Sequence, residues 1–207
     1  WRSSAAYRVR IALALKGLDW TTAAVHRVRD GGEQHGPSYR RINPQALVPS
    51  LVAGDHVLTQ SLAIIEYLDE TCPEPPLLPA DPLGRARVRS IAQVVDCDIH
   101  PLNNHLVLQW LKGHLGADDG QRDQWYRHWI AEGFAAIEAA LSASPDTGRF
   151  CHGDRPTVAD LCLVPQVYNA VRYECDLEPY PEIRRVNAAC LELGAFRGAA
   201  PEAQPDA

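Results

Sequence analysis

The sequence lacks the marks of a membrane protein and of a nucleic-acid-binding protein. No apolar run approaches the length that crosses a bilayer, and the first residues do not show the charged and then apolar pattern of a secretory signal. The 20 Lys and Arg are outnumbered by 26 Asp and Glu, so no basic surface for a nucleic acid is expected. We therefore predict a soluble protein that binds neither membranes nor nucleic acids.

Cysteine pairs are also lacking. The six cysteines are scattered, with no CxxC motif and no cluster of histidines beside them, which argues against a zinc site and against a disulfide framework. Reduced thiols in the cytoplasm are the simplest interpretation. The chain opens at Trp1 and not at a methionine, so we expect a few residues to precede it.

A proline-rich segment divides the chain. Residues 73–82 contain five prolines in ten positions, which excludes a helix and an interior strand and indicates a semi-rigid linker. Before it, in residues 1–72, short β-rich pieces alternate with helical ones. After it, residues 83–207 have a helical pattern. The sequence thus predicts a small α/β domain followed by an all-α domain.

The first domain is expected to lack an obvious opening strand. The spacing predicts a helix over residues 4–16, a strand over 20–25, and a hairpin of residues 50–53 and 56–59 around Gly54-Asp55. A further helix begins at Ser61 and ends at Cys72-Pro73.

The second domain is expected to hold four or five helices. One long segment covers residues 83–115, with a kink or break at Pro101, and another covers 121–141. Thr157 stands three residues before Asp160, a spacing typical of a capping box at a helix start. The last helix is predicted over residues 181–193.

Two hydroxyl residues, Ser3 and Ser4, stand where the first helix begins. Backbone N–H groups and the helix dipole favour an anion there, and a thiolate in that place would have a pKa below the usual value of about 8.5. The plain alternative is an ordinary N-cap, which the spacing alone favours. Gln60 and Ser61 stand at another helix start, with the same two interpretations. Two such sites in one small domain fit a ligand with two negative groups.

Val48-Pro49 and two arginines are further candidates. From the residues alone the bond before Pro49 is expected to be trans, and a binding role requires that Val48 expose its backbone groups to a peptide-like ligand. Arg2 and Arg172 are candidates for holding a dicarboxylate, although most surface arginines are only solvated.

Polar residues gather beside Pro101. His100, Asn103 and Asn104 are spaced i, i+3 and i+4, so we expect them to share a helix face. They either border a cavity or form hydrogen bonds between helices. The acidic residues nearby alternate with apolar ones and point to different faces, so no metal site is predicted.

Several motifs together resemble the zeta class of glutathione transferases, which includes maleylacetoacetate isomerases and the bacterial maleylpyruvate isomerases. In chain order they are WRSSAAYRVRIAL (1–13), NPQALVP (43–49), QSLAIIEYL (60–68), DIHPLNN (98–104), TVADLCLVPQ (157–166) and DLEPYP (176–181). The DIHPLNN segment looks closer to the maleylpyruvate isomerases. Order and spacing are kept over nearly the whole chain.

This resemblance implies a thioredoxin-like N-terminal domain, an all-helical C-terminal domain, a homodimer and glutathione as cofactor. It also places a first strand ahead of Trp1. For catalysis and glutathione binding it implies Ser3, Ser4, Gln34 or His35, Val48 before a cis Pro49, Gln60, Ser61, Asn103 and Asn104; for substrate binding it implies Arg2 and Arg172, with His100 nearby.

Two departures from the family pattern bear on the substrate. Ala5 stands where the signature has cysteine, and Ala6 where it has a second serine, although catalysis by bound glutathione needs no protein thiol. His105-Leu106 stands where some maleylpyruvate isomerases have a third arginine, which weakens the substrate assignment.

The function implied is glutathione-dependent cis–trans isomerisation of a small unsaturated dicarboxylic keto acid, maleylpyruvate or maleylacetoacetate, in the breakdown of aromatic compounds. One alternative is a general glutathione transferase that conjugates or dehalogenates small electrophiles. The other is a non-catalytic adaptor with the same fold. The retained Ser3, Val48-Pro49 and Gln60-Ser61 set speaks against the adaptor.

Overall fold

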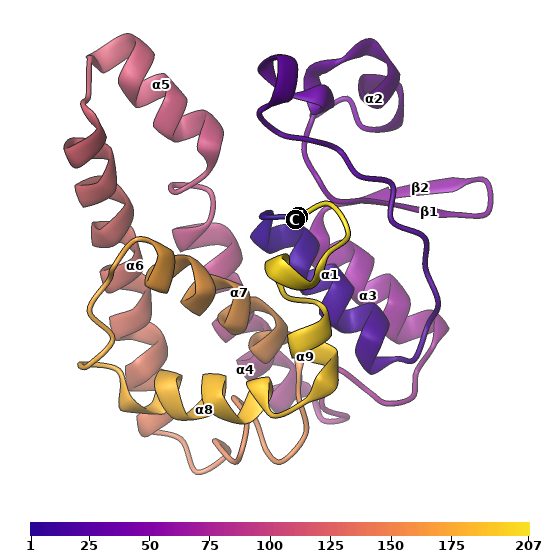
Figure 1. Ribbon diagram of the computed structural model, residues 1–207. Helices are drawn as coiled ribbons and strands as arrows, with labels where there is room; N and C mark the ends of the chain where they lie inside the picture. The colour runs from indigo at the N-terminus through magenta and orange to yellow at the C-terminus, as the bar shows by residue number, and fades with distance from the viewer. The chain divides into compact units, whose positions relative to one another are not determined.

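The computed structural model describes all 207 residues apart from the side chain of Asp30. It divides into two compact units (Figure 1). The first is formed by Trp1–Leu77 together with Leu191–Ala207, and the second by Leu78–Cys190. Among the described residues, no helix combines the length and the apolar character needed to span a membrane.

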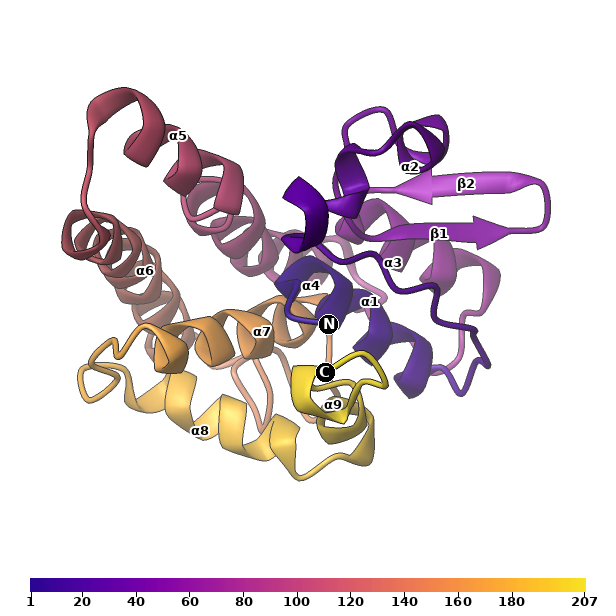
Figure 2. The same cartoon turned by 45° about the horizontal axis from the view of Figure 1, so that its top comes forward.

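The last residues of the chain belong to the first unit, whereas the sequence-based division assigned all of residues 83–207 to the second. The cause is a set of contacts with the first helix. The Tyr7 hydroxyl donates to the carbonyl oxygen of Phe196, and Arg10 Nε donates to that of Ala199, each over 3.0 Å. Figure 2 shows the two chain ends side by side in this unit. The sequence-based boundary is corrected at this end.

The first unit combines a two-stranded sheet with helices. Its elements are α1 (Ser4–Leu15), the 3-10 turns Arg29–Gly31 and Glu33–His35, α2 (Pro37–Ile42), β1 (Ser50–Ala53), β2 (His56–Thr59), α3 (Ser61–Thr71), α9 (Gly194–Gly198) and the 3-10 turn Pro201–Ala203. Helices α1 and α3 pack against each other, and α9 lies against α1 (Figures 1 and 2).

Local signals explain the elements that the sequence predicts correctly. Helix α1 begins after Ser3 because the Ser3 Oγ accepts a hydrogen bond from the amide of Ala6 over 3.2 Å. Strands β1 and β2 pair antiparallel, with Ser50 opposite Thr59. Gly54, at φ 59°, takes the left-handed conformation that this tight turn needs. The predicted helix 4–16 and hairpin are confirmed.

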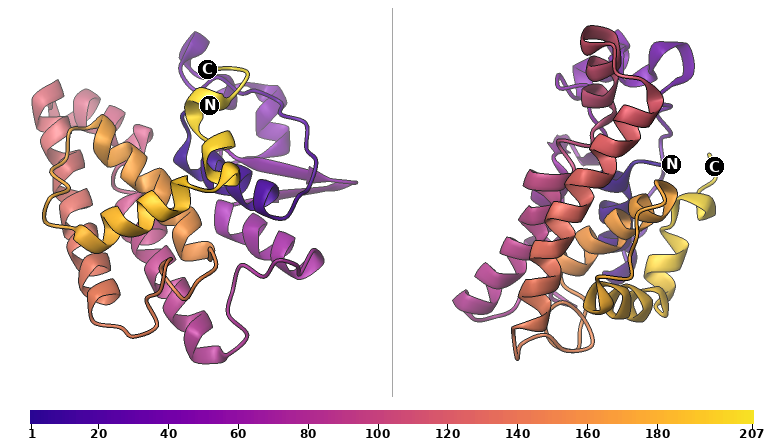
Figure 3. Two further views of the ribbon diagram at one scale, coloured as in Figure 1. Left: turned by 60° about the horizontal axis from the view of Figure 1, so that its bottom comes forward. Right: turned by 90° about the vertical axis from the view of Figure 1, so that its left-hand side faces the viewer.

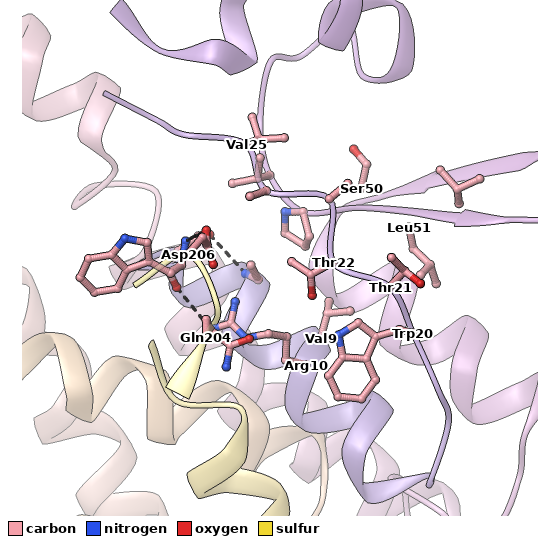
Figure 4. A pocket seen from close by; sticks show the side chains of 18 of the residues that line it. Val9, Arg10, Trp20, Thr21, Thr22, Val25, Ser50, Leu51, Gln204 and Asp206 are labelled. Carbon is pink, nitrogen blue, oxygen red and sulfur yellow. Dashed lines mark hydrogen bonds and ion pairs between the residues drawn. The ribbon is translucent and has the colours of Figure 1, made fainter. Parts of the chain in front are cut away.

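The predicted strand over residues 20–25 is not formed. The segment is extended, but it pairs with no strand in the described structure, whose sheet holds only β1 and β2. An apolar slot of about 260 Å³ separates it from β1, and Val9 and Leu13 of α1 line the same slot (Figure 4). A strand needs a partner for its backbone groups. The first strand expected ahead of Trp1 stays a prediction.

The unpaired segment leads to a hydrogen-exchange prediction. Amides of residues 20–25 are expected to exchange at close to unprotected rates in the 207-residue chain, because the structure gives their N–H groups no acceptor. Amides of Val9 to Leu13, within the buried part of α1, serve as the internal control and should be strongly protected. Equal protection of the two segments, measured by mass spectrometry or NMR, would contradict this description.

The second unit is all helical. Its elements are α4 (Pro82–Gln93), a π-helical turn (Val94–Ile99), α5 (His105–Leu115), α6 (Asp119–Ser142), α7 (Val158–Arg172) and α8 (Pro181–Leu191). Helix α4 packs against α7, and α6 packs against the π-helical turn, so α7 and the turn lie among the long helices (Figure 3). Helix α7 is buried along most of its length.

The predicted long helix over residues 83–115 is interrupted near Pro101, as expected. The chain leaves the helix after Ile99 and starts again at His105. Residues 100–104 therefore form a turn, and the expectation that His100, Asn103 and Asn104 share one helix face is wrong. A proline within the segment and the absence of its N–H explain the break.

The capping box before α7 is confirmed, and it is fully buried. The carboxylate of Asp160 accepts from the amide of Thr157 over 2.7 Å, from the Thr157 hydroxyl over 2.9 Å and from the amide of Cys151 over 2.8 Å. Burial raises the pKa of Asp160, and the hydrogen bonds from Cys151 and Thr157 act in the opposite direction. One side chain thus ties the start of α7 to the preceding loop.

A buried lysine anchors the proline-rich linker to the first unit. Lys16 Nζ contacts the carboxylate of Asp69 over 2.8 Å and donates to the carbonyl oxygens of Cys72 and Pro75 over 2.6 and 2.9 Å. The same carboxylate accepts from the amide of Leu77 over 2.8 Å. The charge of Lys16 is therefore fully paired at the end of α1 that lies away from Ser3.

Candidate functional site

Ser3 has the geometry of a donor at a helix start. It is buried, its Oγ caps α1 by accepting from the amide of Ala6, and the first turn of α1 carries no acidic side chain. Because the oxygen acts as the acceptor in the cap, the hydroxyl hydrogen remains available to donate to an anion. The helix dipole adds to this preference for negative charge. The sequence left two alternative roles for Ser3, an N-cap and a donor to an anion. The structure allows one hydroxyl to fill both.

The residues before β1 expose backbone groups. The Val48–Pro49 bond is cis, as the resemblance implies and contrary to the trans bond expected from the residues alone. The turn that precedes it is held by Asn43 Nδ2, which donates to the carbonyl oxygen of Leu47 over 2.8 Å. No hydrogen bond to the backbone of Val48 is found within the described structure. Val48 and Pro49 line the same slot as Ser3.

The start of α3 forms a second polar region. Gln60 is the N-cap, with φ 67°, but its side chain does not cap the helix and instead donates through Nε2 to Gln45 Oε1 over 2.9 Å. Ser61 is 4% exposed and its Oγ accepts from Nη1 of Arg8 over 3.2 Å. The side chain of Gln60 thus leaves the first amides of α3 uncapped, which suits a carboxylate ligand.

Gln34 is the better placed of the two candidates for the glycine carboxylate. It is buried on the 3-10 turn Glu33–His35, its Nε2 donates to the carbonyl oxygen of Arg27 over 3.4 Å, and its Oε1 has no partner. Because a carboxylate only accepts hydrogen bonds, the group of Gln34 that suits it is the second N–H of Nε2, whereas Oε1 is itself an acceptor. His35 is half-buried, and its carbonyl oxygen accepts from Arg40 Nε.

The two candidate arginines are exposed, each beside an aromatic ring. Arg2 lies over the ring of Trp1, with 4.1 Å between its Cζ and the ring centroid. Arg172 ends α7 in the second unit and lies over the ring of Tyr173 at 5.7 Å. Their joint action on one substrate stays a prediction.

The asparagines near Pro101 have structural partners. Asn104 caps α5, with its Oδ1 accepting from the amide of Leu106 over 3.0 Å. Asn103 Nδ2 donates to the carbonyl oxygen of Tyr126 over 3.1 Å, which links the turn to α6, while its Oδ1 is buried without a partner. His100 is half-buried in the same turn. Helix-to-helix bonding accounts for part of this group, and a role in glutathione binding stays a prediction.

Two of the buried thiols, Cys151 and Cys190, are unsuited to act as nucleophiles. Burial raises the pKa of both Cys151 and Cys190, and the nearby carboxylate of Asp160 raises each further. Position 5, next to the serine pair, is Ala5. Among the described residues, no group of three or more His, Cys, Asp or Glu is arranged to hold a metal ion. A sulfur nucleophile at the start of α1 would therefore have to come from a ligand.

Sequence reasoning missed Arg8 as part of this region. The side chain is fully buried and reaches Ser61, 53 residues further along the chain. The only local signal was an arginine inside the apolar run of the first helix. Its partner becomes visible only when α1 and α3 are packed together.

Comparisons with known proteins agree with the arrangement. Residues 2–71 match the family described as "Glutathione S-transferase, N-terminal domain", and residues 119–189 match the corresponding C-terminal domain. A Ralstonia protein named "Maleylpyruvate isomerase" is 53% identical over 207 residues, covering 100% of this chain and 96% of its own. The "Maleylacetoacetate isomerase" of Pseudomonas aeruginosa is 50% identical, covering 100% and 95%.

Solved structures show the same likeness. A "Holo structure of Maleyl Pyruvate Isomerase, a bacterial glutathione-s-transferase in Zeta class" matches with a TM-score of 0.97 and 52% identity, covering 100% of this chain and 97% of the other. The maleylacetoacetate isomerase of Anaeromyxobacter dehalogenans, with glutathione bound in its active site, matches with a TM-score of 0.88 and 47% identity, covering 100% and 94%.

Proposed function

Because the chain belongs to the zeta class of the glutathione S-transferase family, we propose that it is a glutathione-dependent cis–trans isomerase of a small unsaturated dicarboxylic keto acid. Maleylpyruvate and maleylacetoacetate are the substrates proposed, because both are named in relatives about half identical over the full chain. The observation within the structure that carries the proposal is the buried Ser3 hydroxyl, with its hydrogen available at the start of α1.

The residues of the first unit fit a tripeptide with two carboxylates and a thiol. The start of α3, with Ser61, suits the carboxylate of the γ-glutamyl end. The unpaired backbone of Val48 suits the peptide in the middle, and the second N–H of the buried Gln34 Nε2 suits the carboxylate of the glycine end. The Ser3 hydroxyl suits the sulfur. Each end of glutathione thus has a chemically matched group in this unit.

Bound glutathione supplies a thiolate whose reversible addition turns the locked carbon–carbon double bond into a single bond that can rotate. Ser3 donates its hydroxyl hydrogen to the sulfur and, with the α1 dipole, keeps the thiol ionised at neutral pH. Arg2 stands next to Ser3 in the chain and supplies a cation for a substrate carboxylate and for the negative charge that develops on the adjacent carbonyl oxygen during addition. We propose that Arg172 binds the second carboxylate.

The proposal includes a cytoplasmic homodimer, as the resemblance implies. All six cysteines are free, which fits a reducing compartment. Analytical ultracentrifugation of the purified chain is expected to give twice the mass of the 22.8 kDa chain, and a monomer at micromolar concentration would contradict the dimer.

The deciding experiment follows product and thiol together. Each of the two substrates is incubated with enzyme, with and without glutathione, while the fumaryl product and the free thiol are measured. We expect product only when glutathione is present, and no loss of thiol as product accumulates. Loss of one thiol per product would instead identify a conjugating transferase. No turnover and no glutathione binding would identify the adaptor.

A further inference from the structure

Arg8 is a buried cation directly beneath the start of α3. It is 0% exposed, and it is the largest of the fully buried side chains among the described residues. From α1 its Nη1 donates to Ser61 Oγ over 3.2 Å, a contact between residues 53 positions apart. Burying a guanidinium is unfavourable unless its hydrogen-bond partners offset the lost hydration. A purely apolar contact between α1 and α3 would avoid that cost.

The direction of this hydrogen bond decides what Ser61 can do. Arginine is always a donor, so the Ser61 oxygen is the acceptor. The hydroxyl hydrogen of Ser61 is then turned away from Arg8 and is available to donate. Ser61 is also the first residue of α3, where the helix dipole favours negative charge and the side chain of Gln60 leaves the amides uncapped. The hydroxyl, the amides and the buried cation all favour the same ligand group, a carboxylate.

We propose that Arg8 is a positioning residue for glutathione, which holds the Ser61 hydroxyl as a donor to the α-carboxylate of the γ-glutamyl end. This inference rests on the proposed function. A merely structural role would be to fasten α1 to α3. Lys16 provides a comparison for that role, because it is also a buried cation, at the C-cap of α1, and it is bound to α3 through Asp69. It lies eight residues further along, at the opposite end of α1 from Ser3.

The test compares two ligands across variants. One ligand is glutathione, and the other is its analogue in which 4-aminobutanoate replaces the γ-glutamyl residue, so that only the α-carboxylate is missing. Calorimetry gives the ratio of the two dissociation constants for the parent chain, Arg8→Met and Lys16→Met. We expect glutathione to bind the parent roughly 10–100-fold more tightly than the analogue, the range for hydrogen bonds to a charged group.

In Arg8→Met that ratio is expected to fall at least about fivefold, while Lys16→Met should lower thermal stability and leave the ratio unchanged. Equal weakening of both ligands in Arg8→Met would show that Arg8 only supports the fold, and would overturn the inference. Failure of the parent to bind either ligand would remove the proposed function as well. If the parent is an active isomerase and the ratio of the two dissociation constants is the same in Arg8→Met, only this inference is removed and the proposed function stands.

A second pair of variants decides the matter if Arg8→Met does not fold. Arg8→Lys keeps a cation but loses the planar donor group, and Ser61→Ala removes the hydroxyl. If Arg8 acts through Ser61, the variant that combines Arg8→Lys with Ser61→Ala changes the ratio of the two dissociation constants no more than Ser61→Ala alone. If the two substitutions instead change this ratio independently, so that their separate fold-changes multiply in the double variant, the inference is contradicted.

Discussion

Replacing Ser3 by alanine is expected to lower kcat for isomerisation by about 10²–10³-fold, the usual loss when one preorganised donor to developing charge is removed. The dissociation constant for glutathione should change much less, because Val48, Gln34 and the start of α3 hold the rest of the tripeptide. The acid limb of the pH–rate profile should move to higher pH, since the bound thiol loses a hydrogen bond to its ionised form.

Two controls separate this effect from loss of the helix cap. Ser3→Thr keeps both the hydroxyl and the cap and should retain most activity. Asp118→Ala removes the exposed cap of α6, where Asp118 Oδ1 accepts from the amide of Gln121 over 2.8 Å. It is expected to cost about 1 kcal/mol of stability with no change in kcat. An unaltered kcat in Ser3→Ala would remove Ser3 from the catalytic role.

Replacing Asp160 by alanine is expected to lower the free energy of unfolding by about 3–5 kcal/mol. The substitution leaves the amides of Cys151 and Thr157 and the Thr157 hydroxyl without their acceptor in a fully buried place. It also removes the favourable charge at the start of α7, which is buried along most of its length. A fall in Tm of roughly 10 °C should follow for a chain of this size.

Asp118→Ala again serves as the control, because it removes the N-cap carboxylate of a capping box at an exposed helix start, whereas Asp160 is the N3 carboxylate of a buried one. Its fall in Tm should be only about 2–4 °C. Thermal melts followed by circular dichroism measure both. Equal losses in the two variants would show that burial of Asp160 adds nothing to its cap. Asp160→Asn should remain strongly destabilising, since its amide group would face the donors of Thr157.

Helix starts and tight turns could be predicted from the sequence because their signals are local. Ser3 before α1, Gly54 in the hairpin and Thr157 with Asp160 before α7 act within four residues of the structure they fix. The strand over residues 20–25 failed for the opposite reason. Its β-rich composition predicts a strand, but a strand exists only with a partner, and none is present in the described structure.

The other differences between the sequence-based prediction and the structure come from contacts between residues far apart in the sequence. The last residues join the first unit because Tyr7 and Arg10 reach Phe196 and Ala199, a separation of 189 positions that no spacing pattern indicates. The Arg8–Ser61 contact is of the same kind. For the candidate site, residue types alone left cap and anion donor as open alternatives at Ser3. The direction of the hydrogen bond from Ala6 showed that both roles fit one hydroxyl.

We propose that the start of α1 holds the thiol of glutathione in its ionised form through Ser3. Titration of the ultraviolet absorbance of the thiolate, with glutathione bound to the purified protein, tests it directly. We expect a pKa clearly below the ordinary thiol value of about 8.5 in the parent chain, and a return toward that value in Ser3→Ala. A bound thiol that titrates like free glutathione in the parent chain would contradict it.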